Sequence, residues 1–181
     1  MRSAIALSLI CLFIVTPSAG QTFTLRSSDV GGQATDKQVF NGFGCAGANV
    51  SPQLSWENVP EGTKSIAVTM YDPDAPTGSG WWHWLVFDIP ATAKELPSNA
   101  GEPKLNIAPK GCVQSMTDFG AAGYGGPCPP PGHGFHTYII TVYALKVDKL
   151  GLDEKARPAL VGYNLNANTI RKASLVMYYG R

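Results

Sequence analysis

The chain has 181 residues, with 14 Lys and Arg against 13 Asp and Glu, and its formal net charge is +1 at pH 7. A charge so close to zero gives no electrostatic reason to expect nucleic acid or an anionic membrane as the main partner. Twenty glycines and fourteen prolines, together with abundant Val, Ile, Thr and Tyr, indicate many turns and short strands, which predicts a mostly β domain.

The first twenty residues predict an export signal. Arg2 is followed by an apolar run over 4–15 and by small residues up to Gly20, which is the pattern of a secretory signal peptide. The run is too short to span a bilayer, which needs about 20 apolar residues, and no other stretch approaches that length. We therefore expect a signal peptide over 1–20 and a single domain over 21–181, periplasmic or secreted and without a membrane span.

Three cysteines follow the signal segment: Cys45, Cys112 and Cys128. An oxidising compartment favours one disulfide and leaves one thiol over. Cys45 and Cys128 each lie in a glycine-rich or proline-rich loop, and loops can meet without breaking a strand ladder, so we predict the Cys45–Cys128 disulfide. The alternative is a buried free thiol at each position. The absence of a CxxC pair argues against a thioredoxin-type motif and a structural zinc site.

The predicted strands are short near the start of the chain and long in its middle. Residues 65–71 are rich in β-formers and bounded by turn residues, which predicts a strand. Residues 81–89 are apolar at both parities, as in a central strand covered on both faces. Strict alternation would place four of its side chains on one face: Trp81, His83, Leu85 and Phe87. Shorter strands are expected over 22–25, 38–40, 53–56 and 113–118.

The region over 91–134 is long and irregular, with eight glycines and seven prolines. Irregular stretches of this length in a compact domain are usually functional loops or disordered. It leads into a predicted strand over 135–145 whose alternation places four side chains on one face: His136, Tyr138, Ile140 and Val142. A helix is expected over 153–168 with Asp153 as its N-cap, and a closing strand over 173–179.

Two of these strands begin alike, each with a histidine and an aromatic residue two positions apart after a loop rich in Pro and Gly. The polar residues of this pattern are candidates for a site, with Trp81 and Tyr138 as walls: Asp72, Asp74, His83, His133 and His136. A single such motif is as readily structural as functional, because a buried histidine bonded to a carboxylate often only supports the fold. Two matching strand starts favour a site.

Three chemistries compete for these residues. A metal site could use two histidines and a carboxylate, but no HxH or HExxH spacing occurs. A Ser-His-Asp hydrolase lacks the GxSxG elbow. We favour a pocket for an anion or a polar headgroup without turnover, in which imidazoles, a tyrosine hydroxyl and loop N–H groups donate to phosphate or carboxylate oxygens. Trp and Pro walls would exclude water from it.

Four segments together resemble the phosphatidylethanolamine-binding protein family, and most of all its exported bacterial branch of YbhB/YbcL-like members. They are DPDAP at 72–76, WWHW at 81–84, PCPPPGHGFHTY at 127–138 and VGYNLNAN at 161–168. The resemblance implies an antiparallel β-sandwich with Greek-key connections and one short helix near the C-terminus. It also implies a small pocket for phosphate-bearing or other anionic ligands, with no enzyme activity, metal or cofactor.

Carried over motif by motif, the resemblance assigns seven residues to this pocket: Asp72, Pro76, Trp81, His83, Pro130, His136 and Tyr138. The expected function is an exported binding protein whose partner is a small anion such as phosphate or a phospholipid headgroup, and which regulates a partner protein. One alternative is a protein-interaction or inhibitor module with a vestigial pocket. The other is a hydrolase or metal enzyme built on the two histidines.

Overall fold

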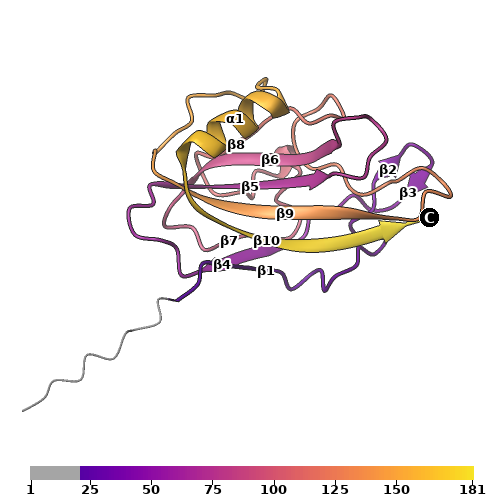
Figure 1. Ribbon diagram of the computed structural model, residues 1–181, viewed down its shortest axis with the longest axis horizontal. Coiled ribbons are helices and arrows are strands. Elements are labelled where there is room, and N and C mark those ends of the chain that lie inside the picture. Colours follow the sequence, from indigo (N-terminus) through magenta and orange to yellow (C-terminus); the bar gives the residue numbers. More distant parts are fainter. Residues whose placement is uncertain (1–20) are drawn as a thin grey trace, which may run out of the picture.

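The computed structural model describes residues 21–181, so the predicted signal peptide lies outside the described residues. Four long strands and the short β8 form a five-stranded antiparallel sheet in the order β10-β9-β5-β6-β8 (Figure 1). Its strands are β5 (Ser65–Asp72), β6 (Trp81–Pro90), β8 (Val113–Gln114), β9 (Phe135–Leu145) and β10 (Thr169–Gly180).

The shorter elements complete the domain. A three-stranded antiparallel sheet has the order β1-β4-β7, and β2 pairs with β3. The bounds are β1 (Thr24–Arg26), β2 (Asn41–Gly42), β3 (Cys45–Ala46), β4 (Leu54–Glu57), β7 (Glu95–Leu96), the 3-10 helix η1 (Pro103–Leu105) and α1 (Pro158–Asn168). Among residues 21–181 no helix combines the length and the apolar character needed to cross a membrane.

The five-stranded sheet has the strand order of a Greek key. β5, β6 and β8 lie side by side in chain order, and β9 returns to pair with the free edge of β5. The connections differ from the simplest form of the motif, because the chain passes through β7 of the other sheet between β6 and β8. The mostly β, antiparallel architecture with one short helix near the C-terminus is therefore confirmed.

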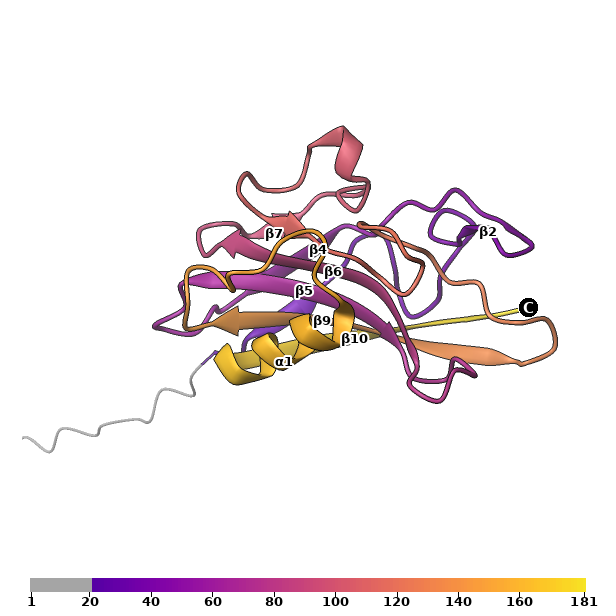
Figure 2. The ribbon, with the colours of Figure 1, turned by 90° about the horizontal axis from the view of Figure 1, so that it is seen from above.

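The five-stranded sheet is covered on both faces. On one face, Leu54 and Trp56 of β4 join a buried cluster with Ile66 and Val68 of β5. On the other face, α1 contributes to a second buried cluster through its Val161 and Leu165 side chains. Figure 2 shows α1 on one side of the long strands and β4 and β7 on the other. Burial on both faces explains why β6 is apolar at both parities.

β6 departs from strict alternation because it contains two bulges. Met70 and Tyr71 are adjacent in β5, yet they pair with Trp84 and Trp82, so His83 is an extra residue. A second register shift lies farther along β6, where Asp88 has a φ of 57°. A bulge reverses the faces of the residues beyond it. Leu85 and Phe87 consequently lie on the α1 face, and the predicted shared face of Trp81, His83, Leu85 and Phe87 is wrong.

Three predicted elements differ more strongly from the structure. Residues 38–40 are not a strand: the N–H groups of Gln38 and Val39 both donate to the Thr35 carbonyl, which makes a turn. The helix begins at Pro158, because Arg157 is extended and a residue before proline is disfavoured in the α region. Asp153 instead closes a turn, where its Oδ1 accepts from Lys155 N–H. The predicted strand at 113–118 extends only over β8.

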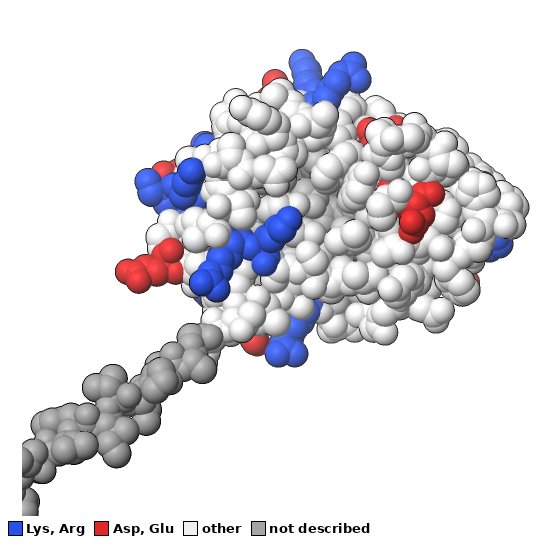
Figure 3. Space-filling view, in the orientation of Figure 1, with Lys and Arg blue, Asp and Glu red and all other residues white. Residues whose placement is uncertain are grey.

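The surface charge is sparse. On the face in Figure 3, Lys and Arg side chains gather mainly on the left half, and the right-hand end carries few charged groups. Figure 1 places β2, β3 and the C-terminus at that end.

Candidate functional site

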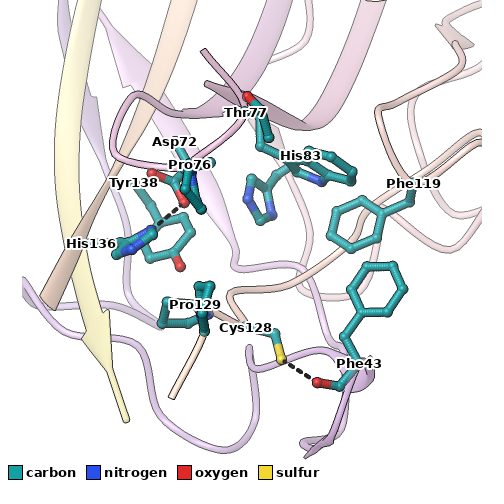
Figure 4. Close-up of a pocket in the computed structure, with 13 residues that line it drawn as sticks. Phe43, Asp72, Pro76, Thr77, His83, Phe119, Cys128, Pro129, His136 and Tyr138 are labelled. Atoms are coloured by element: carbon teal, nitrogen blue, oxygen red, sulfur yellow. Dashed lines mark hydrogen bonds and ion pairs between the residues drawn. The ribbon is translucent and has the colours of Figure 1, made fainter. Parts of the chain in front are cut away.

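A cavity of about 170 Å³ opens where β5, β6 and β9 meet the loops around residues 43 and 128 (Figure 4). All seven residues that the resemblance assigned to a pocket line this one cavity, although they come from three separate segments. The complete lining is Phe43, Asp72, Ala75, Pro76, Thr77, Trp81, His83, Phe119, Cys128, Pro129, Pro130, His136 and Tyr138.

Asp72 and His136 form the polar side of the cavity. His136 Nδ1 donates to Asp72 Oδ2 at 2.8 Å, and both side chains are almost fully buried. The other carboxylate oxygen, Asp72 Oδ1, accepts from Asp74 N–H at 2.8 Å. Asp74 Oδ2 in turn accepts from Thr137 N–H at 2.7 Å. The two aspartates of the DPDAP turn therefore hold that turn against the start of β9 and fix the orientation of the His136 ring. Asp74 itself does not line the cavity.

His83 is held by the loop around Gly125. Its Nδ1 donates to the Gly125 carbonyl at 2.7 Å, and Gly125 N–H donates back to the His83 carbonyl at 2.9 Å. Because a carbonyl only accepts, Nδ1 must keep its hydrogen. Burial lowers the pKa of His83 to about 4, against the opposing effects of the Gly125 carbonyl and Asp72. His83 is consequently neutral at pH 7, and its Nε2 has a lone pair.

Tyr138 contributes a hydroxyl without a partner. Its side chain is buried, and among residues 21–181 no group hydrogen-bonds to Tyr138 Oη. Burial raises the pKa of Tyr138, so the hydroxyl keeps its proton and remains a donor. Buried polar groups in proteins nearly always have a hydrogen-bond partner. Tyr138 is therefore a lining residue with a buried, unpaired hydroxyl donor.

The remaining walls are apolar. Phe119 stacks on Phe43 with ring centroids 5.7 Å apart and meets Trp81 edge to face at 5.5 Å. No Lys or Arg is among the lining residues. Sequence reasoning missed Phe43 and Phe119, because both lie in loops where no periodicity distinguishes one aromatic residue from another. It also missed four neighbours of its assigned residues or loops: Ala75, Thr77, Cys128 and Pro129.

The predicted Cys45–Cys128 disulfide is confirmed, and Cys112 is the free thiol among the described residues. The bond joins the loop of β2 and β3 to the segment that lines the cavity. His133 is exposed and does not line the cavity, although its ring lies 5.7 Å from that of His136. Within residues 21–181 no group of three or more His, Cys, Asp and Glu side chains is arranged to hold a metal ion.

Comparison with known proteins gives consistent matches. The family model described as phosphatidylethanolamine-binding protein matches residues 30–180. YbcL of Escherichia coli is 51% identical over 174 residues, which cover 95% of each chain. YbhB of the same organism is 47% identical over 157 residues, 86% of this chain and 98% of that protein.

Solved structures of similar fold give matches consistent with these. The crystal structure of Escherichia coli YbcL, described as a new member of the mammalian PEBP family, has a TM-score of 0.86 and 53% identity, and the match covers 88% of this chain and 98% of that one. A putative homolog from Chlamydia trachomatis has a TM-score of 0.72 and 27% identity, with 88% and 97% covered.

Proposed function

The chain belongs to the phosphatidylethanolamine-binding protein family, and on this premise we propose that its cavity binds a small anionic group, either free phosphate or a phospholipid headgroup. The observation that supports this most is the unpaired Tyr138 hydroxyl in the cavity wall. A phosphate oxygen would accept from it and supply the missing partner.

The rest of the lining is held in place before a ligand arrives. Asp72 orients His136, and the Gly125 carbonyl orients His83, so neither ring has to be ordered when a ligand arrives. Preorganised polar groups lower the entropy cost of binding. The walls of Trp81, Phe43 and Phe119 would exclude water and strengthen each hydrogen bond to the ligand. Because no Lys or Arg lines the cavity, recognition would depend on hydrogen bonds more than on net charge.

The test is a titration of the protein with inorganic phosphate and with phosphoethanolamine, followed by NMR of the His83 and His136 rings. We expect both imidazoles to shift together. Tyr138→Phe removes only the hydroxyl and should weaken binding roughly 10- to 100-fold, as expected for a lost hydrogen bond to a charged group. Tyr163→Phe, on the exposed side of α1, is the matched control and should bind as the wild type does.

Imidazole signals that stay unmoved with both ligands at millimolar concentration would end this proposal. A response to phosphoethanolamine but not to phosphate would assign the cavity to a headgroup, whereas equal responses would assign it to the phosphate group alone. Hydrolysis of phosphoethanolamine to ethanolamine and phosphate would contradict a role in binding without catalysis.

We further propose that the protein acts after export, with residues 1–20 removed, and that it regulates a partner protein. Phe43 and Phe135 support the regulation of a partner protein, because each side chain is about two-thirds exposed. Phe43 lines the cavity, and Phe135 precedes His136, which also lines it. Protein recovered from the exported fraction should have the mass of a chain that begins at Gln21. A partner captured from that fraction should be lost with Phe43→Ser; capture that survives this change would remove Phe43 from the contact.

A further inference from the structure

Arg181 binds three backbone carbonyls in two different loops. Its Nε donates to the Pro129 carbonyl at 2.6 Å, Nη1 to the Gly44 carbonyl at 2.9 Å and Nη2 to the Phe43 carbonyl at 3.1 Å. The Arg181 carbonyl also accepts from Gly132 N–H at 2.9 Å. These acceptors lie far from Arg181 in the sequence. The guanidinium group therefore fastens together two segments that the sheet alone does not join.

Both segments are walls of the cavity. Phe43 lines it from one loop, and Cys128, Pro129 and Pro130 line it from the other. In Figure 4 the labelled Phe43 and Pro129 lie beside Cys128, below His83 and His136. The dashed line there marks a 3.6 Å contact between Cys128 Sγ and the Phe43 carbonyl. A disulfide sulfur has no hydrogen to donate, so this contact does not hold the carbonyl as Arg181 does.

Phe43 needs such support because its backbone is strained. Its φ is 52°, in the left-handed region that a bulky side chain rarely adopts. Conformations of this kind persist only where the surroundings enforce them. Phe43 is mostly exposed, so burial does not enforce it. What remains is the two-residue turn between β2 and β3, which requires positive φ at Phe43 and Gly44, together with stacking on Phe119, the disulfide two residues farther on and the bond from Arg181.

We propose that Arg181 is a positioning residue of the cavity: its guanidinium fork sets the spacing between the Phe43 wall and the Pro129 wall. The fork matters because three donors in one rigid plane meet three carbonyls at once, which the single ammonium of lysine cannot do. The disulfide limits how far Cys45 and Cys128 can separate. Arg181 determines how the neighbouring carbonyls, and with them the Phe43 ring, are turned.

The test compares Arg181→Met and Arg181→Lys with the wild type. Two readouts need no ligand: the ring signals of Phe43 and Phe119, and hydrogen exchange at Phe40 N–H, which bonds the Pro127 carbonyl across the same two loops. We expect both variants to shift the ring signals and to speed this exchange at least several-fold. The exposed Arg171 of β10 supplies the control, Arg171→Met, which should change neither.

A third readout, the Kd for inorganic phosphate, rests on the proposed function and should rise several-fold in both Arg181 variants. Unchanged ring signals and exchange in Arg181→Met would overturn the positioning role. Ring signals and hydrogen exchange in Arg181→Lys that match those of the wild type would also overturn the positioning role, because a positive charge without the planar fork would then be sufficient. If the wild type binds no phosphate, the proposed function fails, and the ring signals and exchange still decide the role of Arg181.

Discussion

His136 Nδ1 lies 2.8 Å from Asp72 Oδ2, although the two residues are 64 positions apart and belong to different strands. The contact forms because β5 pairs with β9 and the turn after Asp72 folds against the first residues of β9. Two loop-to-strand junctions distant in the sequence thus become one polar cluster at the end of the buried core.

Replacing Asp72 by asparagine should destabilise the protein by about 1–3 kcal/mol. The Asp72 carboxylate accepts from His136 and from Asp74 N–H through separate oxygens, whereas an amide has one accepting oxygen. Either one of these N–H donors is left unpaired, or His136 must change tautomer to accept from the new amide, and both outcomes cost free energy. Urea unfolding measures this cost. Asp148→Asn is the control, because that side chain is largely exposed and only 3.9 Å from Lys64, and its effect should stay within about 0.5 kcal/mol.

His83 should make stability depend on pH between about 4 and 6.5. Its pKa is about 4 in the folded protein and 6.5 ordinarily, so in this range the unfolded chain binds more protons. Stability therefore rises with pH through the range and should be lower at pH 4 than at pH 6.5 by on the order of 3 kcal/mol from this group. Asp72 and His136 also act on His83. Urea unfolding of His83→Gln should show a smaller pH slope than the wild type; identical slopes would contradict the assignment.

Loss of the disulfide should lower the free energy of unfolding. It closes a loop between positions 83 residues apart, and removal of a native disulfide typically costs about 2–5 kcal/mol. The double variant Cys45→Ser with Cys128→Ser should unfold at correspondingly lower urea concentration. Cys112→Ser, at the half-buried free thiol, should cost less than this pair. Thiol counting on the unreduced mature protein should find Cys112 alone, and a second reactive thiol would refute the pairing.

Two glycines of the turn before β6 should respond differently to alanine. Gly78 and Gly80 both have positive φ, so each substitution has the left-handed penalty of about 1–2 kcal/mol. At Gly78 a Cβ meets nothing within 4 Å, whereas at Gly80 it would overlap the Tyr71 hydroxyl and lie 2.6 Å from the Asp72 carbonyl. Thermal unfolding should therefore show a clearly larger loss of stability for Gly80→Ala. Equal losses would mean that the turn can shift to make room for the added methyl group.

Much of this molecule could be predicted from residue patterns, because the relevant forces are local. The long strands β5, β6 and β9 follow from runs of β-formers between turn residues. The seven assigned lining residues came from the resemblance of the motifs at the ends of these strands to a known family. The bulge at His83 could not be predicted, since it exists only in register with β5. Phe43 and Phe119 reach the cavity through loop geometry that the disulfide and tertiary packing determine.

The bulge at His83 makes the cavity depend on the number of residues in β6 as well as on their identity. A deletion of one residue between Trp82 and Trp84 would make the ladder regular, and it would preserve the pairing of Met70 with Trp84. The residues on the Trp81 side would keep their partners in β5 and therefore their faces, because Tyr71 would still pair with Trp82. The cavity would lose only the His83 side chain, which the extra residue adds to its wall. The number of residues in β6 thus decides whether the strand can present a side chain to the cavity between Trp82 and Trp84 without disturbing the ladder on either side.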